Sequence, residues 1–385
     1  MNPIFANLQT SIFEEMSALA RLHQAINLGQ GFPDDPGPED VRRKAAEAVV
    51  DGWNQYPPMM GIPELRQAVA KHYADHQALS VDPATEVMVT SGATEALCGA
   101  LLALVTPGDE VVLFEPAYDA YLPLVLRAGG VPRFVKLAPP DWRFTAEQLK
   151  AAIGPKTRVV LLNNPQNPSG AVYGAAELQL LADAMKGTDA IVVADEVWEH
   201  VIFDRRAHTS VLAVPDLRER AVKIGSAGKI FCLTGWKVGF VVATPPILKV
   251  LAKAHQYITF TTPPNLQAAV AYGLGKEAAH FAAMRNDLQA KRDHLAKGLR
   301  KAGLTVLATE GTYFLNVDLA PLGLKDDAAF CRRLVTEAGV AAIPVSAFYA
   351  DASMKSVIRF CFAKNDHTLD ESVRRLSEAA PRLVG

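Results

Sequence analysis

The sequence predicts an α/β fold: a large, doubly wound domain with a mostly parallel sheet, joined to a smaller α+β domain. Strand-like runs alternate with helical patterns through the middle of the chain, which indicates parallel strands linked by crossover helices. These runs are almost continuous in Val, Ile and Leu, as is typical of strands buried on both faces. A chain of 385 residues is also too long to fold around a single hydrophobic core, which favours two domains.

The large domain is expected over residues 46–280. Its strand-like runs lie at residues 86–90, 110–114, 157–163, 190–195, 221–226 and 238–243. Helical patterns follow several of them, at residues 94–104, 175–186 and 246–254. This alternation is the reason for expecting parallel strands in this part of the chain.

The smaller domain is expected over residues 281–385, where the pattern changes. A long helical stretch at 278–301 leads into short strand-like pieces at 305–308, 312–317, 340–344 and 356–361, and a last helix follows Asp366. We expect residues 1–45 to form an N-terminal arm that completes this smaller domain.

Composition excludes several classes of protein. With 39 Lys and Arg against 41 Asp and Glu, the net charge is 39 − 41 = −2, so the basic surplus of a nucleic-acid binder is missing. The longest apolar stretch, 96–105, is about half of what a bilayer requires. Glu14 and Glu15 interrupt the N-terminal segment, so a signal peptide is not expected. The four cysteines show no metal or CxxC spacing, so we expect a cytoplasmic protein without a membrane partner.

Two glycine-containing stretches begin like nucleotide loops. Residues 29–31 lack the third glycine of a dinucleotide fingerprint, and Pro33 and Pro36 oppose a helix there. Residues 225–229 lack the spacing of a phosphate loop. A nucleotide is therefore disfavoured as the ligand.

Ligands bind at the carboxyl ends of parallel strands, and four short segments follow strand-like runs. In the first, at 91–94, small residues allow backbone N–H groups to approach an anion, although an ordinary helix-capping turn is the alternative. In the second, at 163–170, two Asn-Pro pairs fix an irregular loop, which needs no function of its own. Neither segment alone indicates a ligand site, and each is interpreted together with the next two segments.

The third and fourth segments carry charge. Asp195 ends an apolar strand, so its carboxylate requires a cation or a proton donor. Lys229 is either a solvated strand tip or a desolvated amine with a lowered pKa, fit for Schiff-base chemistry. A carboxylate, a phosphate-shaped turn, an amide and a reactive lysine together suit pyridoxal 5′-phosphate (PLP), whose pyridinium nitrogen, phosphate, phenolic oxygen and aldehyde need those partners.

At this point the chain resembles the fold type I aminotransferases of class I/II, closest to the kynurenine and methionine aminotransferase branch. The resemblance rests on INLGQGFPD at 26–34, NQYPPM at 54–59, GWKVG at 235–239 and VIRFCF at 357–362, besides the four strand-end segments. It implies a seven-stranded type of sheet in the PLP domain, and a homodimer with active sites shared between subunits.

The resemblance also implies roles toward the cofactor. Lys229 would form the Schiff base and move a proton between the substrate Cα and the cofactor. Asp195 would keep the pyridine nitrogen protonated, and Asn167 would bind the phenolic oxygen. Tyr118 would stack on the pyridine ring, a core tyrosine being the alternative. The phosphate would be held by Gly92, Ala93, Thr94, Ser226 and Lys237, with Tyr56 reaching it from the neighbouring subunit.

On the substrate side, the resemblance implies that Arg359 grips the α-carboxylate with a bidentate fork, a surface salt bridge being the alternative. Gly31 would lend a backbone N–H, Asn167 would lie beside the substrate, and Phe260 of the neighbouring subunit would line the pocket. Aromatic side chains expected around the pocket favour aromatic or thioether substrates; they are Phe13, Phe32, Tyr56, Tyr118, Phe260 and Phe348.

One residue departs from the family pattern. The family usually has Tyr after Asp-Glu-Val, where its hydroxyl contacts the phenolic oxygen, but this chain has Trp198. An indole offers one N–H donor and no acceptor, so Trp198 either donates to that oxygen or points away. We expect an active enzyme in which the pKa of the cofactor–lysine Schiff base is altered.

The expected function is a PLP-dependent aminotransferase. It would move an amino group between an aromatic, methionine-like or kynurenine-like L-amino acid and a 2-oxo acid by a ping-pong mechanism. A cysteine-S-conjugate β-lyase using the same Lys229, or an N-succinyldiaminopimelate aminotransferase, remains open, since chain motifs do not separate them. A transcription regulator with an aminotransferase-like domain is disfavoured by the balanced charge and the short segment before the large domain.

Overall fold

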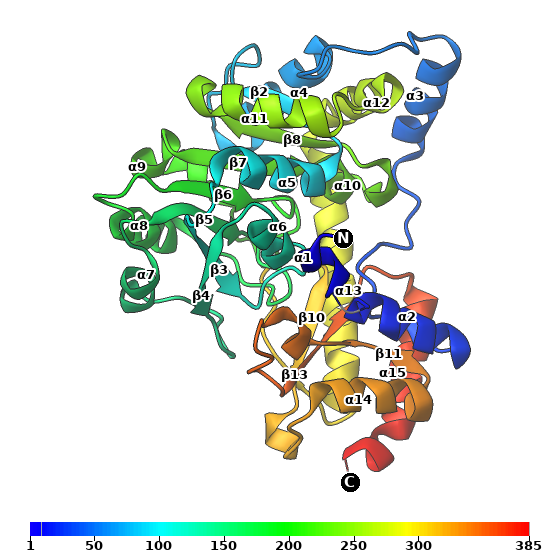
Figure 1. Ribbon diagram of the computed structural model, residues 1–385. Coiled ribbons are helices and arrows are strands. Elements are labelled where there is room, and N and C mark those ends of the chain that lie inside the picture. The colour runs from blue at the N-terminus through cyan, green and yellow to red at the C-terminus, as the bar shows by residue number, and fades with distance from the viewer. Residues whose placement is uncertain (9, 385) are drawn as a thin grey trace.

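The computed structural model describes residues 1–8 and 10–384, and it is built around a seven-stranded sheet (Figure 1). The strand order is β2-β8-β7-β6-β5-β3-β4. Only β8 runs antiparallel to its neighbours among the described strands of this sheet, so the expected mostly parallel sheet is confirmed. The strands are β2 Val87–Thr90, β3 Glu110–Glu115, β4 Val131–Lys136, β5 Thr157–Asn163, β6 Ile191–Asp195, β7 Ala221–Ser226 and β8 Gly239–Ala243.

Both faces of this sheet are buried, as the apolar runs predict. In β3, Val112 and Phe114 belong to one apolar core, whereas Val111 and Leu113 belong to the other. Alternate residues of one strand therefore fill two cores. The helices of this part are α3 Glu39–Val50, α4 Pro63–Gln77, α5 Gly92–Leu104, α6 Tyr121–Arg127, α7 Ala146–Ala152, α8 Ala175–Ala184, α9 Pro215–Arg218, α10 Ala227–Ile230, α11 Pro245–Ile258 and α12 Pro264–Leu274.

A second, antiparallel sheet lies in the C-terminal part, in the order β12-β13-β10-β9. Figure 1 shows α13 running from the large sheet into this smaller unit. β1 pairs in parallel with β11, which fastens the N-terminal arm here. The elements are α1 Pro3–Ala6, α2 Ile12–Leu22, β1 Ile26–Asn27, α13 Ala278–Lys301, β9 Thr305–Val306, β10 Phe314–Asp318, α14 Asp327–Arg333, β11 Val340–Ala341, β12 Ile343–Pro344, β13 Val357–Cys361 and α15 Asp366–Val384.

Shorter helical turns complete the backbone. They are 3₁₀ turns at Val211–Ala213, Thr234–Trp236, Ala320–Leu322 and Val345–Phe348, and a π turn at Leu334–Ala338. None of the described helices is long and apolar enough to cross a membrane.

The structure differs from the sequence expectations in three places. The edge strand β4 is missed because it is only half buried and carries Arg133 and Lys136. The expected single strand at 340–344 is two short strands that join different sheets. Cys331 and Cys361 are buried as expected of small apolar residues, whereas Cys98 and Cys232 are only half buried.

Candidate active site

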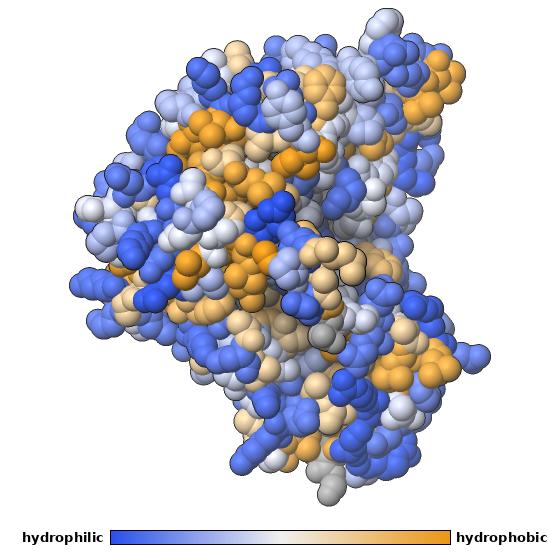
Figure 2. All heavy atoms as spheres, in the orientation of Figure 1, coloured by the Kyte–Doolittle hydropathy of each residue, from blue (hydrophilic) through white to orange (hydrophobic). Residues whose placement is uncertain are grey.

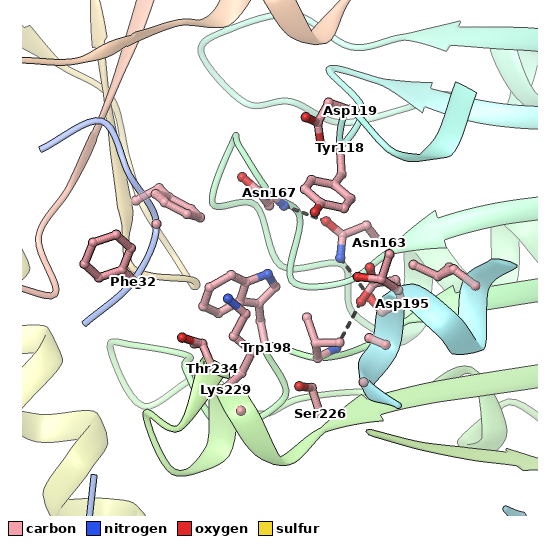
Figure 3. Close-up of a pocket in the computed structure, with 18 of the residues that line it drawn as sticks. Phe32, Tyr118, Asp119, Asn163, Asn167, Asp195, Trp198, Ser226, Lys229 and Thr234 are labelled. Carbon is pink, nitrogen blue, oxygen red and sulfur yellow. Dashed lines mark hydrogen bonds between the residues drawn. The ribbon is translucent and has the colours of Figure 1, made fainter. Parts of the chain in front are cut away.

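A cavity of about 390 Å³ opens at the carboxyl ends of β5, β6 and β7 (Figure 3). Its size is within the range of small-molecule sites. Residues from both sheets and from the N-terminal arm line it. Phe348, expected beside the pocket, is not among the residues that line it. The residues singled out in the sequence that do line it are Phe13, Gly31, Phe32, Gly92, Ala93, Thr94, Tyr118, Asn167, Asp195, Trp198, Ser226, Lys229, Lys237 and Arg359.

One end of the cavity is suited to an anion. α5 begins at Gly92, directly after β2, and no side chain caps this helix start. Gly92 has φ +75°, and a Cβ atom there would lie 3.1 Å from Lys237 Cε. A Cβ on Gly239 would lie 2.7 Å from the Gly92 carbonyl carbon, so the turn depends on close backbone packing. Uncapped N–H groups and the Lys237 ammonium, 3.4 Å from Thr94 Oγ1, therefore face the same space.

Asp195 supplies a buried carboxylate at the end of β6. The Tyr121 hydroxyl donates to its Oδ2 at 2.6 Å, and the Val197 N–H donates to its Oδ1 at 3.3 Å. Burial raises the pKa of Asp195, while the hydrogen bond from Tyr121 opposes that shift. Asn163 fixes the neighbouring backbone, since its Nδ2 donates to the Asp195 carbonyl at 2.8 Å and its Oδ1 accepts the Asn167 N–H at 2.7 Å.

Lys229 lies in α10, immediately after β7. Its Nζ is 2.9 Å from the Tyr313 hydroxyl and 4.6 Å from the centre of the Trp198 ring. Burial lowers the pKa of Lys229 to about 8, so near that pH about half of these amines are neutral. A neutral lysine amine can act as a nucleophile or as a base.

Arg359 brings a buried cation from β13 to the same cavity. Nη1 donates to Asn167 Oδ1 at 2.8 Å, Nη2 donates to the Gly29 carbonyl at 3.0 Å, and the guanidinium lies 3.8 Å from the centre of the Phe314 ring. Burial lowers its pKa to about 10, which still leaves it charged near neutral pH. Within the described residues it forms no ion pair, so the surface salt bridge considered for it is wrong. An unpaired buried cation beside a cavity suits a carboxylate ligand.

Two aromatic residues form the walls. Tyr118 is half buried beside the cavity, and burial raises its pKa to about 12. Trp198 does not point away: its indole lines the cavity, and Figure 3 shows the ring nitrogen on the cavity side.

Tyr56 and Phe260 do not line the cavity of their own chain. Tyr56 is 80% exposed and Phe260 is 39% exposed, and the two rings meet edge to face with centroids 5.4 Å apart. They form an exposed pair outside the cavity of their own chain.

Several residues of the cavity were missed in the sequence. Tyr121 and Asn163 hold Asp195 and its backbone, Tyr313 contacts Lys229, and Phe314 supports Arg359. Asp119 also lines the cavity. A partner for the buried Asp195 is required by its charge, but only the three-dimensional arrangement reveals that it is Tyr121.

Comparison with known proteins places the chain in a family. Residues 23–376 match the model of aminotransferase class I and II. The chain is 44% identical to the methionine aminotransferase of Escherichia coli K12, with 96% of each chain covered. It is also 44% identical to the probable N-succinyldiaminopimelate aminotransferase of Mycobacterium tuberculosis (97% of each covered) and 37% identical to the kynurenine–oxoglutarate transaminase of Dictyostelium discoideum (94% and 92%).

Solved structures agree with the sequence relatives. The E. coli YbdL structure, for which a methionine aminotransferase function is described, superposes with a TM-score of 0.95 at 44% identity over 98% of this chain and 99% of its own. The M. tuberculosis N-succinyldiaminopimelate aminotransferase gives 0.95 at 43% identity over 98% and 100%. The fold and the site therefore define a fold type I aminotransferase. This chain belongs to the class I and II aminotransferases and is an enzyme of that kind, within the group of methionine, kynurenine and succinyldiaminopimelate aminotransferases.

Proposed function

We propose that this aminotransferase uses PLP and transfers the amino group of L-amino acids with neutral aromatic, methionine-like or kynurenine-like side chains to 2-oxo acids in a ping-pong cycle. The observation that carries the proposal is the convergence of Lys229, Asp195 and Arg359 on one cavity with an anion-binding turn at its end. Asp195 and Arg359 are buried and Lys229 is partly buried, and each reaches the cavity from a different strand end or strand.

The donor set fits PLP group by group. The turn at Gly92–Thr94, Ser226 and Lys237 would hold the phosphate, because N–H donors and an ammonium gather there. Asp195 would face the pyridine nitrogen, and Asn167 with the Trp198 N–H would face the phenolic oxygen. Tyr118 would cover one face of the ring. When bound, the cofactor supplies the aldehyde and the electron sink for removal of the substrate Cα proton.

Lys229 would act as the nucleophile toward the aldehyde and then as the base at Cα. Its lowered pKa leaves a neutral fraction at mildly alkaline pH. Asp195, as an anion, would keep the pyridine nitrogen protonated, and Tyr121 favours the anion by donating to it. Arg359 would hold the substrate α-carboxylate, with a backbone N–H from Gly31 beside it.

The side-chain pocket favours neutral substrates. Phe13, Phe32 and Leu97 line the cavity as a whole, and the cations among its described lining residues are Lys229, Lys237 and Arg359, each already assigned to the cofactor or the α-carboxylate. Asp119 adds a negative group to the same wall. A substrate side chain with its own carboxylate would therefore meet no unassigned cation among the described residues that line the cavity, and one like charge.

N-succinyldiaminopimelate is the second candidate substrate. The 44% identity to the M. tuberculosis relative favours it. It carries further carboxylates, for which the described cavity offers no additional cation, so its use would require a cation from a second subunit.

A homodimer would complete the site. The exposed pair Tyr56 and Phe260 would reach the partner's phosphate and substrate pocket, respectively. Figure 2 shows hydrophobic side chains gathered over α5, α6 and α11, and the exposed apolar residues there are Leu102, Leu126, Val250, Tyr257 and Ile258. Such a patch suits an apolar surface of a second copy.

The division into an arm of residues 1–45, a PLP domain of 46–280 and a small domain of 281–385 is part of the proposal. The strands of the large sheet lie between Val87 and Ala243, and those of the second sheet between Thr305 and Cys361, which supports it. Pairing of β1 with β11 supports the assignment of the arm to the small domain. A cytoplasmic location agrees with the four free cysteines.

The proposal is tested by an amino-donor screen that follows the half-reaction through the cofactor spectrum. Methionine, phenylalanine and kynurenine should convert the cofactor to its amine form far faster than aspartate or glutamate. The screen also contains N-succinyldiaminopimelate. If the enzyme prefers this compound, the proposal of neutral side chains as the substrate class is wrong. Failure of every amino acid to change the spectrum would contradict the aminotransferase mechanism proposed for this site.

A further inference from the structure

The Tyr313 hydroxyl occupies a specific place between two parts of the site. It donates to the Gly31 carbonyl at 2.6 Å, and it lies 2.9 Å from Lys229 Nζ. Tyr313 is buried and belongs to the turn just before β10, whereas Lys229 follows β7 in the large domain. One phenol therefore links the lysine with the N-terminal arm.

The direction of these hydrogen bonds follows from the chemistry of a phenol. A tyrosine hydroxyl has one proton, and the Gly31 carbonyl can only accept. The proton of Tyr313 is thus directed at Gly31, and its oxygen presents lone pairs to Lys229. The Lys229 amine is the donor in this contact, whether it is charged or neutral.

The Trp198 indole forms the second side of the same space. Lys229 Nζ lies 4.6 Å from the centre of the Trp198 ring, and the rings of Trp198 and Tyr313 pack edge to face with centroids 4.3 Å apart. An aromatic face attracts an ammonium, and the indole does so most strongly. Trp198 therefore offers the lysine a π face, a contact that its lack of a hydroxyl does not prevent.

We propose that Tyr313 is a positioning residue for Lys229: its hydroxyl oxygen and the face of Trp198 form a cradle that holds the lysine amine when the amine is not bonded to the cofactor. The catalytic importance of this cradle rests on the proposed function, in which Lys229 is the cofactor-binding base. The cradle keeps the amine beside the cavity and restricts the conformations of the long lysine side chain, so that the amine starts close to the reacting atom.

The cradle also joins the two halves of the substrate site. Gly31, whose carbonyl accepts the Tyr313 proton, lies on the segment whose Gly29 carbonyl accepts from Arg359 at 3.0 Å. The segment is packed closely, since a Cβ on Gly31 would lie 2.6 Å from Phe314 Cζ. The segment expected beside the substrate carboxylate and the base are thus held by the same tyrosine.

Burial has the largest effect on the pKa of Lys229, and neighbouring groups add to it: Cys361 and Asp195 raise this pKa, and the cations Lys237 and Arg359 lower it. Burial lowers the pKa of Lys229, because an ammonium loses hydration. The lone pairs of Tyr313 and the face of Trp198 favour the ammonium and limit that shift. Removal of the Tyr313 hydroxyl leaves the burial in place and takes away an acceptor, so the pKa of Lys229 must fall further.

The test measures this amine in the full-length chain freed of cofactor. Competitive labelling with a trace of isotopic acetic anhydride over a pH series, read by mass spectrometry of the Lys229 peptide, gives the pKa of this one lysine. In Tyr313→Phe it should fall by between about half a unit and one unit, a threefold to tenfold change in the proton-binding constant. Trp198→Leu, which retains the hydroxyl, should lower it in the same direction.

Tyr349→Phe is the matched control. Tyr349 is a buried tyrosine whose hydroxyl also donates to a backbone carbonyl, that of Leu137 at 2.6 Å, but it does not contact Lys229. This variant should leave the pKa of Lys229 unchanged.

An unchanged pKa in Tyr313→Phe would overturn the cradle, as would an equal fall in Tyr349→Phe. If Tyr313→Phe does not fold, Trp198→Leu decides, and an unchanged pKa there would overturn the cradle equally. Because no cofactor is present, the result is independent of the proposed function, which fails separately if Lys229→Ala retains turnover.

Discussion

Tyr121 and Asp195 form a hydrogen bond of 2.6 Å that joins the first turn of α6 to the end of β6. The phenol stabilises the carboxylate in a place where burial favours its protonated form. Burial has the largest effect on the ionisation of Asp195, and its main counterweight is a residue that the sequence gives no reason to select. Since the carboxylate is proposed to hold the pyridine nitrogen in its protonated state, Tyr121 should influence the rate.

Removal of this hydroxyl in Tyr121→Phe should raise the pKa of Asp195 further, because a hydrogen bond to the anion is lost. The acidic limb of the pH profile of kcat should then move to higher pH, so kcat should fall several-fold on that limb and change little where Asp195 stays ionised. Steady-state kinetics from pH 5 to 9 measure both effects. An acidic limb that stays in place would show that Tyr121 does not control Asp195.

Arg359→Lys should raise KM for amino acids by roughly tenfold to a hundredfold, because an ammonium cannot reproduce the fork of a guanidinium on a carboxylate. The half-reaction with 2-phenylethylamine, which has the aromatic group of phenylalanine without its carboxylate, serves as the comparison. Its rate should change little in the same variant. An equal loss with both substrates would mean that Arg359 supports the structure of the site instead of binding the carboxylate.

Lys237→Ala should weaken the binding of PLP by about tenfold, since one point charge beside the Gly92 turn is lost. Pyridoxal, which lacks the phosphate, should bind wild type and variant alike. Fluorescence titration of the cofactor-free chain with each compound measures the two affinities. Equal weakening of both ligands would argue against a phosphate at this turn.

Asp119→Asn should relax the discrimination against glutamate. The change removes a negative charge from the cavity wall and keeps the shape of the side chain. The ratio of kcat/KM for methionine to that for glutamate should fall several-fold, mainly through faster turnover of glutamate. A ratio that does not change would place Asp119 outside the region that meets the substrate side chain.

A buried charge network lies beside the strand that ends in Asp195. Lys223 of β7 is fully buried and donates to Glu196 and, at 2.7 Å, to Glu199. Lys223→Met would remove the buried cation that Glu196 and Glu199 share, leaving Glu196 with His208 alone, so we expect the free energy of unfolding to fall by about 3–5 kcal/mol. Urea unfolding measures it, with Lys186→Met as the control, because Lys186 forms an exposed ion pair. If Lys223→Met and Lys186→Met lowered the free energy of unfolding equally, the buried network would not be important for stability.

The same network gives stability a defined pH dependence. The charges of Lys223 and His208 outweigh burial and lower the pKa of Glu196 to about 2. A carboxyl whose pKa is depressed by folding contributes stability above its unfolded value, near 4.3, and loses that contribution as the pH falls toward 2. The unfolding free energy of the wild type should therefore decline between about pH 4.5 and pH 2, and Glu196→Gln should flatten the decline. If the unfolding free energy of Glu196→Gln declined with falling pH as steeply as that of the wild type, the decline would come from other carboxyl groups.

The sequence allows much of the fold to be predicted, because apolar runs and helical periods report burial directly. The sequence did not predict the half-buried edge strand β4 or the antiparallel direction of β8, because neither leaves a clear local pattern in the sequence. In the site, Asp195 and Lys229 could be selected from their positions at strand ends. Tyr121 and Tyr313 could not, because their contacts depend on segments 74 and 84 residues away in the chain.

Borohydride reduction of the enzyme as purified with its cofactor shows whether Lys229 bonds covalently to PLP. Borohydride converts a lysine joined to an aldehyde into a stable secondary amine, which survives digestion. Mass spectrometry should find the phosphopyridoxyl mass on the peptide that contains Lys229, and on no other lysine. A label on a different lysine, or an unlabelled Lys229 in enzyme that retains its cofactor and activity, would contradict the account.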